Sequence, residues 1–337
     1  MRVAAFTSLD GPDGVTIQQW DDPDPGPKEA VVDVEACSIN RHDLWILEGE
    51  SSMVGEDVLP FVTGLDLAGR VRSVGDGVAG VEPGDRVVLC PNETCGECTY
   101  CRDGPETLCE EFGLYHGGLA ERALVDADRL LKLPEALSSS VAAAIPTAYM
   151  TAWRMLRRAE VQPGDLVFVP GATGGVGVAA IQLAGVLNAE TIATSRSAEK
   201  LERVGDVGAD HLIQSDDPES LADDVREIGR PDAVINHLGG PFTRAGLDAI
   251  DRGGRMVICG RTAGPVSEFN VGRLFLEHQR IIGSTMGTQG DLRRLVDLAA
   301  GGAYEPVVGG TYDLERTADA FADMQTRDAF GKLVVEP

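Results

Sequence analysis

Four cysteines lie close together in the sequence with the spacing of a metal site. They follow the pattern Cys95-x2-Cys98-x2-Cys101-x7-Cys109. Four thiolates spaced in this way can close a tetrahedral Zn²⁺ site that has no open position, and such an ion has a structural role. An iron–sulfur cluster is the alternative use of the pattern. We expect one zinc ion per chain, in a compartment that keeps thiols reduced.

A glycine-rich loop could bind a phosphate group. It reads Gly171-Ala172-Thr173-Gly174-Gly175-Val176-Gly177 and lies between an apolar run at 166–169 and an apolar stretch from 176. Small residues allow a tight turn and let backbone N–H groups approach a pyrophosphate at a helix N-terminus. The loop could also be a turn that only packs a helix on a sheet. A second apolar run at 191–194 favours a dinucleotide-binding unit.

The end of that second run indicates which dinucleotide binds. NAD-dependent proteins usually have an acidic residue there for the ribose 2′-hydroxyl. This chain has Ser195 instead, followed by Arg196 and, one helical turn later, Lys200. Hydroxyl and guanidinium groups suit a 2′-phosphate, because arginine binds phosphate with two parallel hydrogen bonds. We therefore expect NADPH, although the two basic residues could simply face solvent.

The composition excludes several classes of partner. The 337 residues include 54 acidic and 29 basic side chains, which gives a formal net charge of −25. Nucleic-acid binding needs a basic surface, and anionic membranes repel an acidic protein, so neither partner is expected. The acidic residues are dispersed among apolar segments, as on proteins of a high-salt cytoplasm, and this predicts a halophilic source. The segment 141–274 carries only 17 acidic against 13 basic residues, as expected of a domain that binds a polyanionic cofactor.

Composition and hydrophobic pattern divide the chain into three segments. Residues 1–140 combine short β-branched runs with glycine, proline and aspartate, which is typical of a β-rich structure. Residues 141–274 alternate apolar runs with amphipathic stretches, which predicts an α/β fold with a doubly wound parallel sheet. Residues 275–337 include an amphipathic helix near 291–300 and a final strand at 331–335 that could rejoin the first segment. No targeting signal or run of ~20 apolar residues is visible, so we expect a cytoplasmic protein.

These motifs together resemble the medium-chain dehydrogenase/reductase superfamily over nearly the whole chain. The resemblance also rests on Gly69-x-Val71-x2-Val74-Gly75, on 83–87 (Pro-Gly-Asp-Arg-Val) and on 117–121 (Gly-Gly-Leu-Ala-Glu). It implies a GroES-like catalytic domain built from residues 1–140 and 275–337, with a structural zinc lobe at about 90–112. It also implies a Rossmann domain at 141–274 that binds NADP(H), and a homodimer.

The sequence departs from this resemblance at the catalytic zinc site. Zinc alcohol dehydrogenases of the family bind that ion through a cysteine, a histidine and a further cysteine or aspartate. Asn40, Leu65 and Thr147 stand at the matching positions. Leucine cannot bind a metal, and the other two are poor zinc ligands, so we expect no catalytic zinc. An alternative register would make Cys37, His42 and Asp66 a metal site.

An asparagine in place of the cysteine resembles the zinc-independent reductases of the family. The predicted function is NADPH-dependent reduction of quinones or of activated alkenes, namely enones and enoyl thioesters. After hydride transfer, the enolate or phenolate oxygen needs only hydrogen-bond donors, and water or an acidic group can supply the proton. Two alternatives are an alcohol or polyol dehydrogenase with unrecognised zinc ligands and a non-catalytic NADPH-binding protein.

The candidate site residues follow from these assignments. Asn40, His42 and Asp43 are the candidate catalytic residues, although Asn40 and Asp43 could instead cap the following helix. Tyr115 and His116 are further candidates to face the substrate. The predicted cofactor-binding residues outside the glycine loop are Thr147, Thr151, Ser195, Arg196, Lys200, Leu238, Gly239 and Ser284.

Overall fold

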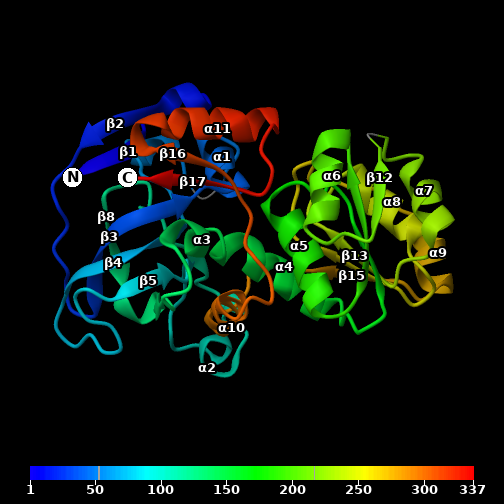
Figure 1. Ribbon diagram of the computed structural model, residues 1–337, viewed down its shortest axis with the longest axis horizontal. Helices are drawn as coiled ribbons and strands as arrows, with labels where there is room; N and C mark the ends of the chain where they lie inside the picture. The colour runs from blue at the N-terminus through cyan, green and yellow to red at the C-terminus, as the bar shows by residue number, and fades with distance from the viewer. Residues whose placement is uncertain (52–53, 216) are drawn as a thin grey trace. The chain divides into compact units, whose positions relative to one another are not determined.

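The computed structural model forms two compact units, and it describes residues 1–51, 54–215 and 217–337 (Figure 1). The first unit comprises residues 1–147 and 288–337, and the second comprises 148–287. The chain passes between the units later than the predicted boundaries at 140 and 274. Helix α4 (Pro146–Arg158) spans the first passage, and strand β15 (Arg280–Gly283) still belongs to the sheet of the second unit.

The first unit is built around strand β3, which pairs with three other strands. Its seven-stranded sheet has the order β16-β17-β3-β4-β5-β9, with β8 paired to β3. The strands and helices of this unit, apart from the first two residues of α4, are β1 (Arg2–Phe6), β2 (Val15–Gln19), β3 (Glu29–Ser38), α1 (Arg41–Leu47), β4 (Asp66–Val74), β5 (Arg86–Leu89), β6 (Asn92–Glu93), α2 (Thr99–Asp103), β7 (Gly113–Leu114), β8 (Arg122–Asp126), β9 (Leu130–Lys132), α3 (Ser139–Ala143), α10 (Gln289–Ala300), β16 (Val308–Asp313), α11 (Thr317–Thr326) and β17 (Lys332–Glu336).

The last strand of the chain completes this sheet, as its apolar pattern predicts. β17 pairs antiparallel with β3 and parallel with β16. Leu333, Val334 and Val335 are buried, and they join a core that includes Phe6, Leu44 and Phe321. Burial of this apolar surface is what brings two ends of the sequence into one sheet.

The second unit is a doubly wound α/β fold with helices on both faces of its sheet (Figure 1). All six strands are parallel, in the order β12-β11-β10-β13-β14-β15. Besides β15, its elements are β10 (Leu166–Val169), α5 (Gly175–Val186), β11 (Glu190–Ser195), α6 (Ala198–Asp206), β12 (His211–Gln214), α7 (Leu221–Ile228), β13 (Ala233–Asn236), α8 (Pro241–Ala249), β14 (Arg255–Ile258) and α9 (Val271–Leu276).

This strand order has its topological switch between β10 and β13, where open parallel sheets bind ligands beyond the strands' carboxyl ends. The predicted α/β fold class is confirmed. Within the described residues, no helix combines the length and the apolar character needed to cross a membrane.

Candidate active site, cofactor loop and metal lobe

A buried carboxylate organises the polar residues where β3 ends and β4 begins. Asp66 is fully buried and accepts hydrogen bonds from Asn40 Nδ2 at 2.9 Å and Ser38 Oγ at 3.2 Å. It also accepts the backbone N–H of Thr147 at 3.0 Å and the hydroxyl of Thr147 at 2.6 Å. The Lys332 ammonium lies 3.3 Å from the same carboxylate. We call these five residues the Asp66 network.

The Asp66 network is assembled by the pairing of three strands. β4 pairs with β3 so that Asp66 lies opposite Ser38, and β17 pairs with β3 so that Val334 lies opposite Ser38. Lys332, two residues before Val334, therefore reaches the same end of β3. The start of α4 adds Thr147 from a fourth segment.

Lys332 is a buried cation that our sequence predictions missed. Its side chain is 4% exposed, and Nζ donates to Ile39 O at 2.9 Å, to Asn40 Oδ1 and to Asp66 Oδ2. All three N–H groups of the ammonium are thus used. The available signal was a lysine at the start of an apolar strand, in a chain that contains only four lysines.

The Asp66 network differs from a metal site in its chemistry. The amide of Asn40 already bonds Lys332 through its oxygen and Asp66 through its nitrogen. The Thr147 hydroxyl donates to Asp66, and Leu65 is buried hydrocarbon. Among the described residues, the one group of three or more His, Cys, Asp or Glu side chains close enough to share a metal ion is the cysteine cluster, so Cys37, His42 and Asp66 form no such group.

A second hydrogen-bonded chain starts at Asp43, the third residue of α1. The fully buried Asp43 accepts the Asn40 backbone N–H at 2.7 Å and the hydroxyl of buried Thr63. Thr63 Oγ1 lies 3.0 Å from His116 Nδ1. The rings of His42 and His116 stack with centroids 5.7 Å apart. The predicted residues Asn40, His42, Asp43 and His116 therefore lie together, whereas Thr63 was missed.

Burial shifts the pKa values of these groups. Burial lowers the pKa of His116 to about 4, helped by the neighbouring His42 ring, and it also lowers the pKa of His42. It raises the pKa of Asp43, against the opposing effect of the Thr63 hydrogen bond. Nε2 of His42 is buried and has no partner among the described residues.

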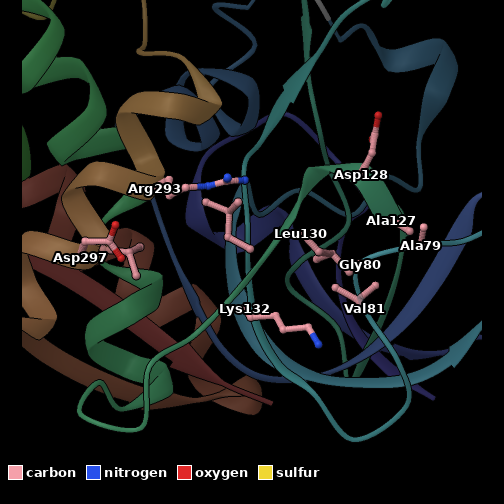
Figure 2. Close-up of a pocket in the computed structure, with 11 residues that line it drawn as sticks. Ala79, Gly80, Val81, Ala127, Asp128, Leu130, Lys132, Arg293 and Asp297 are labelled. Carbon is pink, nitrogen blue, oxygen red and sulfur yellow. The ribbon is translucent and has the colours of Figure 1, made fainter.

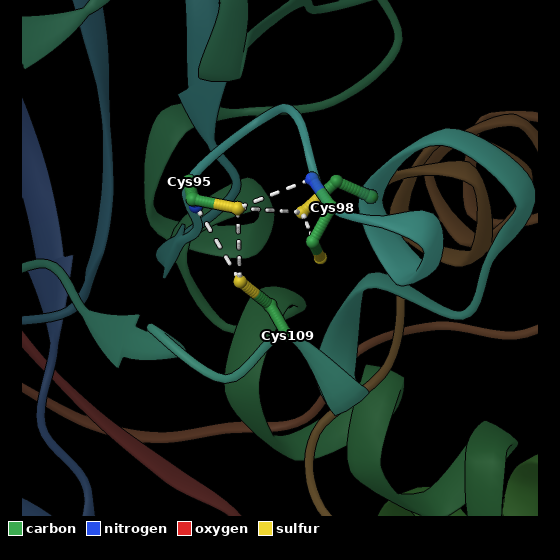
Figure 3. Close-up of side chains that lie close together, drawn as sticks. Cys95, Cys98 and Cys109 are labelled. Atoms are coloured by element: carbon green, nitrogen blue, oxygen red, sulfur yellow. Dashed lines mark hydrogen bonds between the residues drawn. The ribbon is translucent and has the colours of Figure 1, made fainter.

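The four predicted metal-binding cysteines converge on one point in the first unit, and Figure 3 labels three of them. Their sulfur atoms lie within 4.8 Å of one another. The Cys98 backbone N–H donates to Cys95 Sγ at 3.4 Å, and the Cys95 N–H donates to Cys109 Sγ at 3.5 Å. Four thiols from one loop, two of them receiving backbone N–H groups, fit a closed tetrahedral Zn²⁺ site.

Glu106 fixes this metal lobe to the rest of its unit. It lies between two of the cysteines and accepts hydrogen bonds from Asn92 at 3.0 Å and from Arg129 at 2.9 Å. The same carboxylate accepts the Gln289 backbone N–H at 2.9 Å, so the lobe also contacts the segment that re-enters the first unit.

In the second unit, the glycine loop lies between β10 and α5, as predicted. No side chain among the described residues caps the N-terminus of α5, so its first N–H groups are available to an anion. Gly171 has a φ of 65°, which favours glycine, and a Cβ at Gly177 would lie 2.6 Å from the Ala172 backbone. Above Gly174 a Cβ would meet nothing within 4 Å. A tight turn, close helix packing and open space fit a pyrophosphate.

Two polar atoms without partners lie beyond the carboxyl ends of strands in the same sheet. His237 Nδ1 follows β13, Ser284 Oγ follows β15, and both are buried without a partner among the described residues. The Asn236 side chain holds the loop after β13 by accepting the Leu238 and Gly239 N–H groups at 3.1 and 3.0 Å. Unsatisfied groups at this end of a doubly wound sheet fit a bound dinucleotide.

The residues predicted to bind the adenosine end lie at the end of β11, in the turn after it and in the first turn of α6. Ser195 is buried, and its Oγ accepts the Ser197 N–H at 3.1 Å. Ser197 caps α6 by accepting the Lys200 N–H at 3.3 Å, and Arg196 is exposed. Thr151, another predicted cofactor-binding residue, is buried and donates its hydroxyl to Met286 Sδ at 3.9 Å.

A cavity of about 460 Å³ lies elsewhere in the first unit (Figure 2). Helix α10 and the β9 region line it, with Leu130, Lys132, Arg293 and Asp297 among the lining residues. None of its lining residues belongs to the Asp66 network or to the hydrogen-bonded chain of Asp43, Thr63 and His116.

A β-rich unit with a cysteine lobe, together with a doubly wound unit with a glycine loop, is the architecture of the dehydrogenase domains that match this chain. Residues 26–135 match the alcohol dehydrogenase GroES-like domain, and residues 175–301 match the zinc-binding dehydrogenase domain. The chain belongs to the medium-chain dehydrogenase/reductase superfamily.

Similar proteins include reductases of unsaturated thioesters and an alcohol dehydrogenase. An acryloyl-coenzyme A reductase of Metallosphaera sedula is 31% identical, with 96% of each chain covered. The crystal structure of an NAD-dependent alcohol dehydrogenase is 34% identical, with a TM-score of 0.93 and both chains fully covered. The 2-octenoyl-CoA carboxylase reductase CinF, solved with NADP and 2-octenoyl-CoA, is 27% identical over 99% of this chain and 87% of that chain, with a TM-score of 0.89.

Proposed function

We propose that this protein reduces the carbon–carbon double bond of α,β-unsaturated thioesters with NADPH and without a catalytic zinc. Bound NADPH would supply a hydride to the β-carbon. The saturated Asp66 network carries the zinc-independent part of the proposal, because its amide and hydroxyl groups are engaged and Lys332 supplies the local positive charge. The likeness to acryloyl- and octenoyl-thioester reductases supports this substrate class over quinones and simple enones.

The residues of the second unit have definite roles in this proposal. The uncapped N-terminus of α5 would hold the pyrophosphate, together with the loop 171–177. Arg196, with Ser195 and Lys200, would bind the 2′-phosphate and so select NADPH over NADH. His237 and Ser284 would gain hydrogen-bond partners when the cofactor binds.

A substrate panel with metal analysis tests the proposal. Purified protein is mixed with NADPH and with acryloyl-CoA, crotonyl-CoA, an enone or a quinone, and NADPH oxidation is followed by absorbance. Alcohols with NAD⁺ or NADP⁺ form the second arm. We expect turnover of the thioesters and about one zinc per chain. Two zinc ions with alcohol oxidation would instead favour the zinc alcohol dehydrogenase, and no turnover in either arm would favour a non-catalytic NADPH-binding protein.

We assign a structural zinc ion to the cysteine lobe. Cys95, Cys98, Cys101 and Cys109 would each give one thiolate, which leaves no position for water or substrate. A reducing compartment such as the cytoplasm keeps these thiols available to the ion. Replacing Cys109 with serine is expected to lower the zinc content to well below one per chain.

We propose a homodimer formed through the β15 edge of the second unit. Among the described strands, β15 pairs with β14 alone, and Ile281 on it is exposed. Three large apolar side chains nearby in the chain, Val271, Phe275 and Leu276, are each more than 60% exposed. An edge strand flanked by apolar groups can pair with a second copy about a two-fold axis. Light scattering is expected to give twice the chain mass, and Phe275→Asp is expected to give monomers.

We also propose that the acidic surface is an adaptation to high salt. Screening weakens the self-repulsion of a chain with a net charge of −25, so unfolding temperature is expected to rise between 0.1 and 2 M KCl.

A further inference from the structure

The hydrogen-bond chain from Asp43 to His116 has one direction. Thr63 has a single hydroxyl hydrogen, and its oxygen contacts both Asp43 Oδ1 and His116 Nδ1. An ionised carboxylate can only accept, so the hydroxyl hydrogen goes to Asp43. His116 Nδ1 must then be the donor to Thr63, and it carries the ring proton of the neutral imidazole.

Backbone donors favour the ionised form of Asp43. The Asn40 N–H points to Oδ2 at 2.7 Å and the Gly64 N–H points to Oδ1 at 3.3 Å. These groups cannot reverse their direction as a hydroxyl can. Hydrogen bonds to the charged form of a carboxylate stabilise that form.

The backbone holds the donor and acceptor of this chain in place. The Thr63 carbonyl accepts the N–H groups of Gly117 at 3.3 Å and Leu119 at 3.0 Å, and the Gly64 carbonyl accepts the Gly118 N–H at 2.9 Å. Two short segments, one bearing Thr63 and the other following His116, are therefore bound together along their length.

The second nitrogen of His116 remains for another partner. Within the part of the chain that the structure describes, Nδ1 is the ring nitrogen that finds one. The ring is wedged between His42, which stacks on it, and Phe61, whose centroid is 5.0 Å away. With its pKa lowered to about 4 by burial, His116 is neutral at pH 7, and Nε2 then has a free lone pair.

We infer that Asp43 and Thr63 hold His116 in the Nδ1–H tautomer, so that Nε2 accepts a hydrogen bond from a hydroxyl or amide N–H group of the substrate. The binding part of this inference rests on the proposed function, because coenzyme A thioesters carry amide N–H groups in their pantetheine arm. Asp43 connects the two clusters directly, since it also accepts the backbone N–H of Asn40. His116 is a substrate-binding residue in this view, and Thr63 is a positioning residue.

The tautomer can be measured without any assay of activity. Nitrogen NMR of protein labelled with ¹⁵N-histidine distinguishes protonated from unprotonated ring nitrogens, and the His116→Gln variant identifies the signals among the five histidines. We expect a protonated Nδ1 and an unprotonated Nε2 at pH 7. In Thr63→Val the acceptor is lost, and we expect the proton to move to Nε2, whereas Thr63→Ser retains the wild-type tautomer. A wild-type ring that is charged, or protonated at Nε2, would overturn the inference, as would a protonated Asp43 that reverses the chain.

The kinetic test uses thioesters with and without donor groups. Crotonyl-CoA and the N-acetylcysteamine thioester of crotonate carry amide N–H groups, whereas S-ethyl thiocrotonate carries none. Thr63→Val is expected to raise KM about tenfold for the substrates with donors and to change kcat less than twofold, as the loss of one hydrogen bond predicts. KM for the S-ethyl thioester is expected to stay constant.

Thr317→Val is the matched control, because Thr317 is equally buried and donates its hydroxyl to Leu314 O at 2.7 Å. Equal KM changes with all three thioesters would refute the binding role while leaving the tautomer to the NMR result. If no thioester is turned over, the proposed function fails, and the NMR experiment still decides the tautomer.

Discussion

Two polar regions of the molecule differ in how far their hydrogen bonds are satisfied. In the first unit, Asp66, Asn40 and Lys332 bond one another until every donor of the ammonium is used. In the second unit, the carboxyl ends of the strands leave His237 Nδ1 and Ser284 Oγ buried and without partners among the described residues. The Asp66 network is satisfied within the protein, whereas the strand ends of the second unit are where the proposed cofactor would supply the missing partners.

The difference indicates which region would bind a ligand and which region holds the strands in place. A buried polar group without a partner costs about 1–3 kcal/mol, so a fold retains two of them where a ligand compensates the cost. The Asp66 network has no such deficit. Its hydrogen bonds hold β3, β4, β17 and the start of α4 together, and the proposed substrate recognition falls to neighbours such as His116.

Removing the Lys332 ammonium is expected to have the largest effect on the free energy of unfolding. Lys332→Met leaves the Asp66 carboxylate buried and without its counter-charge, and we expect a loss of about 3–5 kcal/mol in the free energy of unfolding. Urea unfolding at pH 7 measures it. The double variant Lys332→Met/Asp66→Asn removes both charges and is expected to recover a large part of the loss.

An exposed lysine provides the control for that measurement. Lys132 pairs with Asp85 at 2.7 Å, but its side chain is 53% exposed. Lys132→Met is expected to cost less than about 1 kcal/mol, because water and salt screen a surface ion pair. Similar losses in the free energy of unfolding for the two lysine variants would show that Lys332 stabilises the fold no more than an exposed ion pair does.

The sequence predicted the second region better than the first. The glycine loop and the strands around it are local patterns, as is the cysteine spacing in the first unit, so their residues can be identified from the sequence alone. The Asp66 network depends on strand register: Lys332 is 266 residues from Asp66, and only the pairing of β17 and β4 with β3 brings them together. Asn40 was found as a deviation from a family pattern, but the partners that occupy its amide were not.

Unfolding at low pH tests a property that His237 of the second unit shares with His116 of the first, namely a pKa lowered by burial. Burial lowers the pKa of His237 to about 4, below the ordinary value of 6.5, as it does for His116. The native state therefore binds fewer protons than the unfolded state between these values. Stability is complete above about pH 6.5 and falls as the pH decreases towards 4, by roughly 3 kcal/mol for each histidine.

Unfolding by urea at pH 7.0 and pH 4.5 measures this effect. His237→Gln is expected to reduce the loss of stability between the two pH values, because the variant has no group to titrate there. His278→Asn is the control, since His278 is exposed and its φ of 55° suits asparagine. An unchanged pH dependence in His237→Gln would mean that the pKa of His237 does not differ between the native and unfolded states.

The smallest expected effect is on the choice between NADPH and NADH, and it tests whether the second unit binds the cofactor through Arg196. Arg196 is exposed on the turn after β11, where its guanidinium would pair with a 2′-phosphate. Wild-type protein is expected to bind NADPH at least about tenfold more tightly than NADH, which corresponds to about 1.4 kcal/mol. Arg196→Ala is expected to remove this preference by weakening NADPH alone, as measured by calorimetric titration. Arg230→Ala is the control, because it removes an equal charge from another exposed position of the same unit. An equal loss of NADPH affinity in both variants would mean that long-range attraction alone causes the preference. It would contradict a direct contact between Arg196 and the 2′-phosphate.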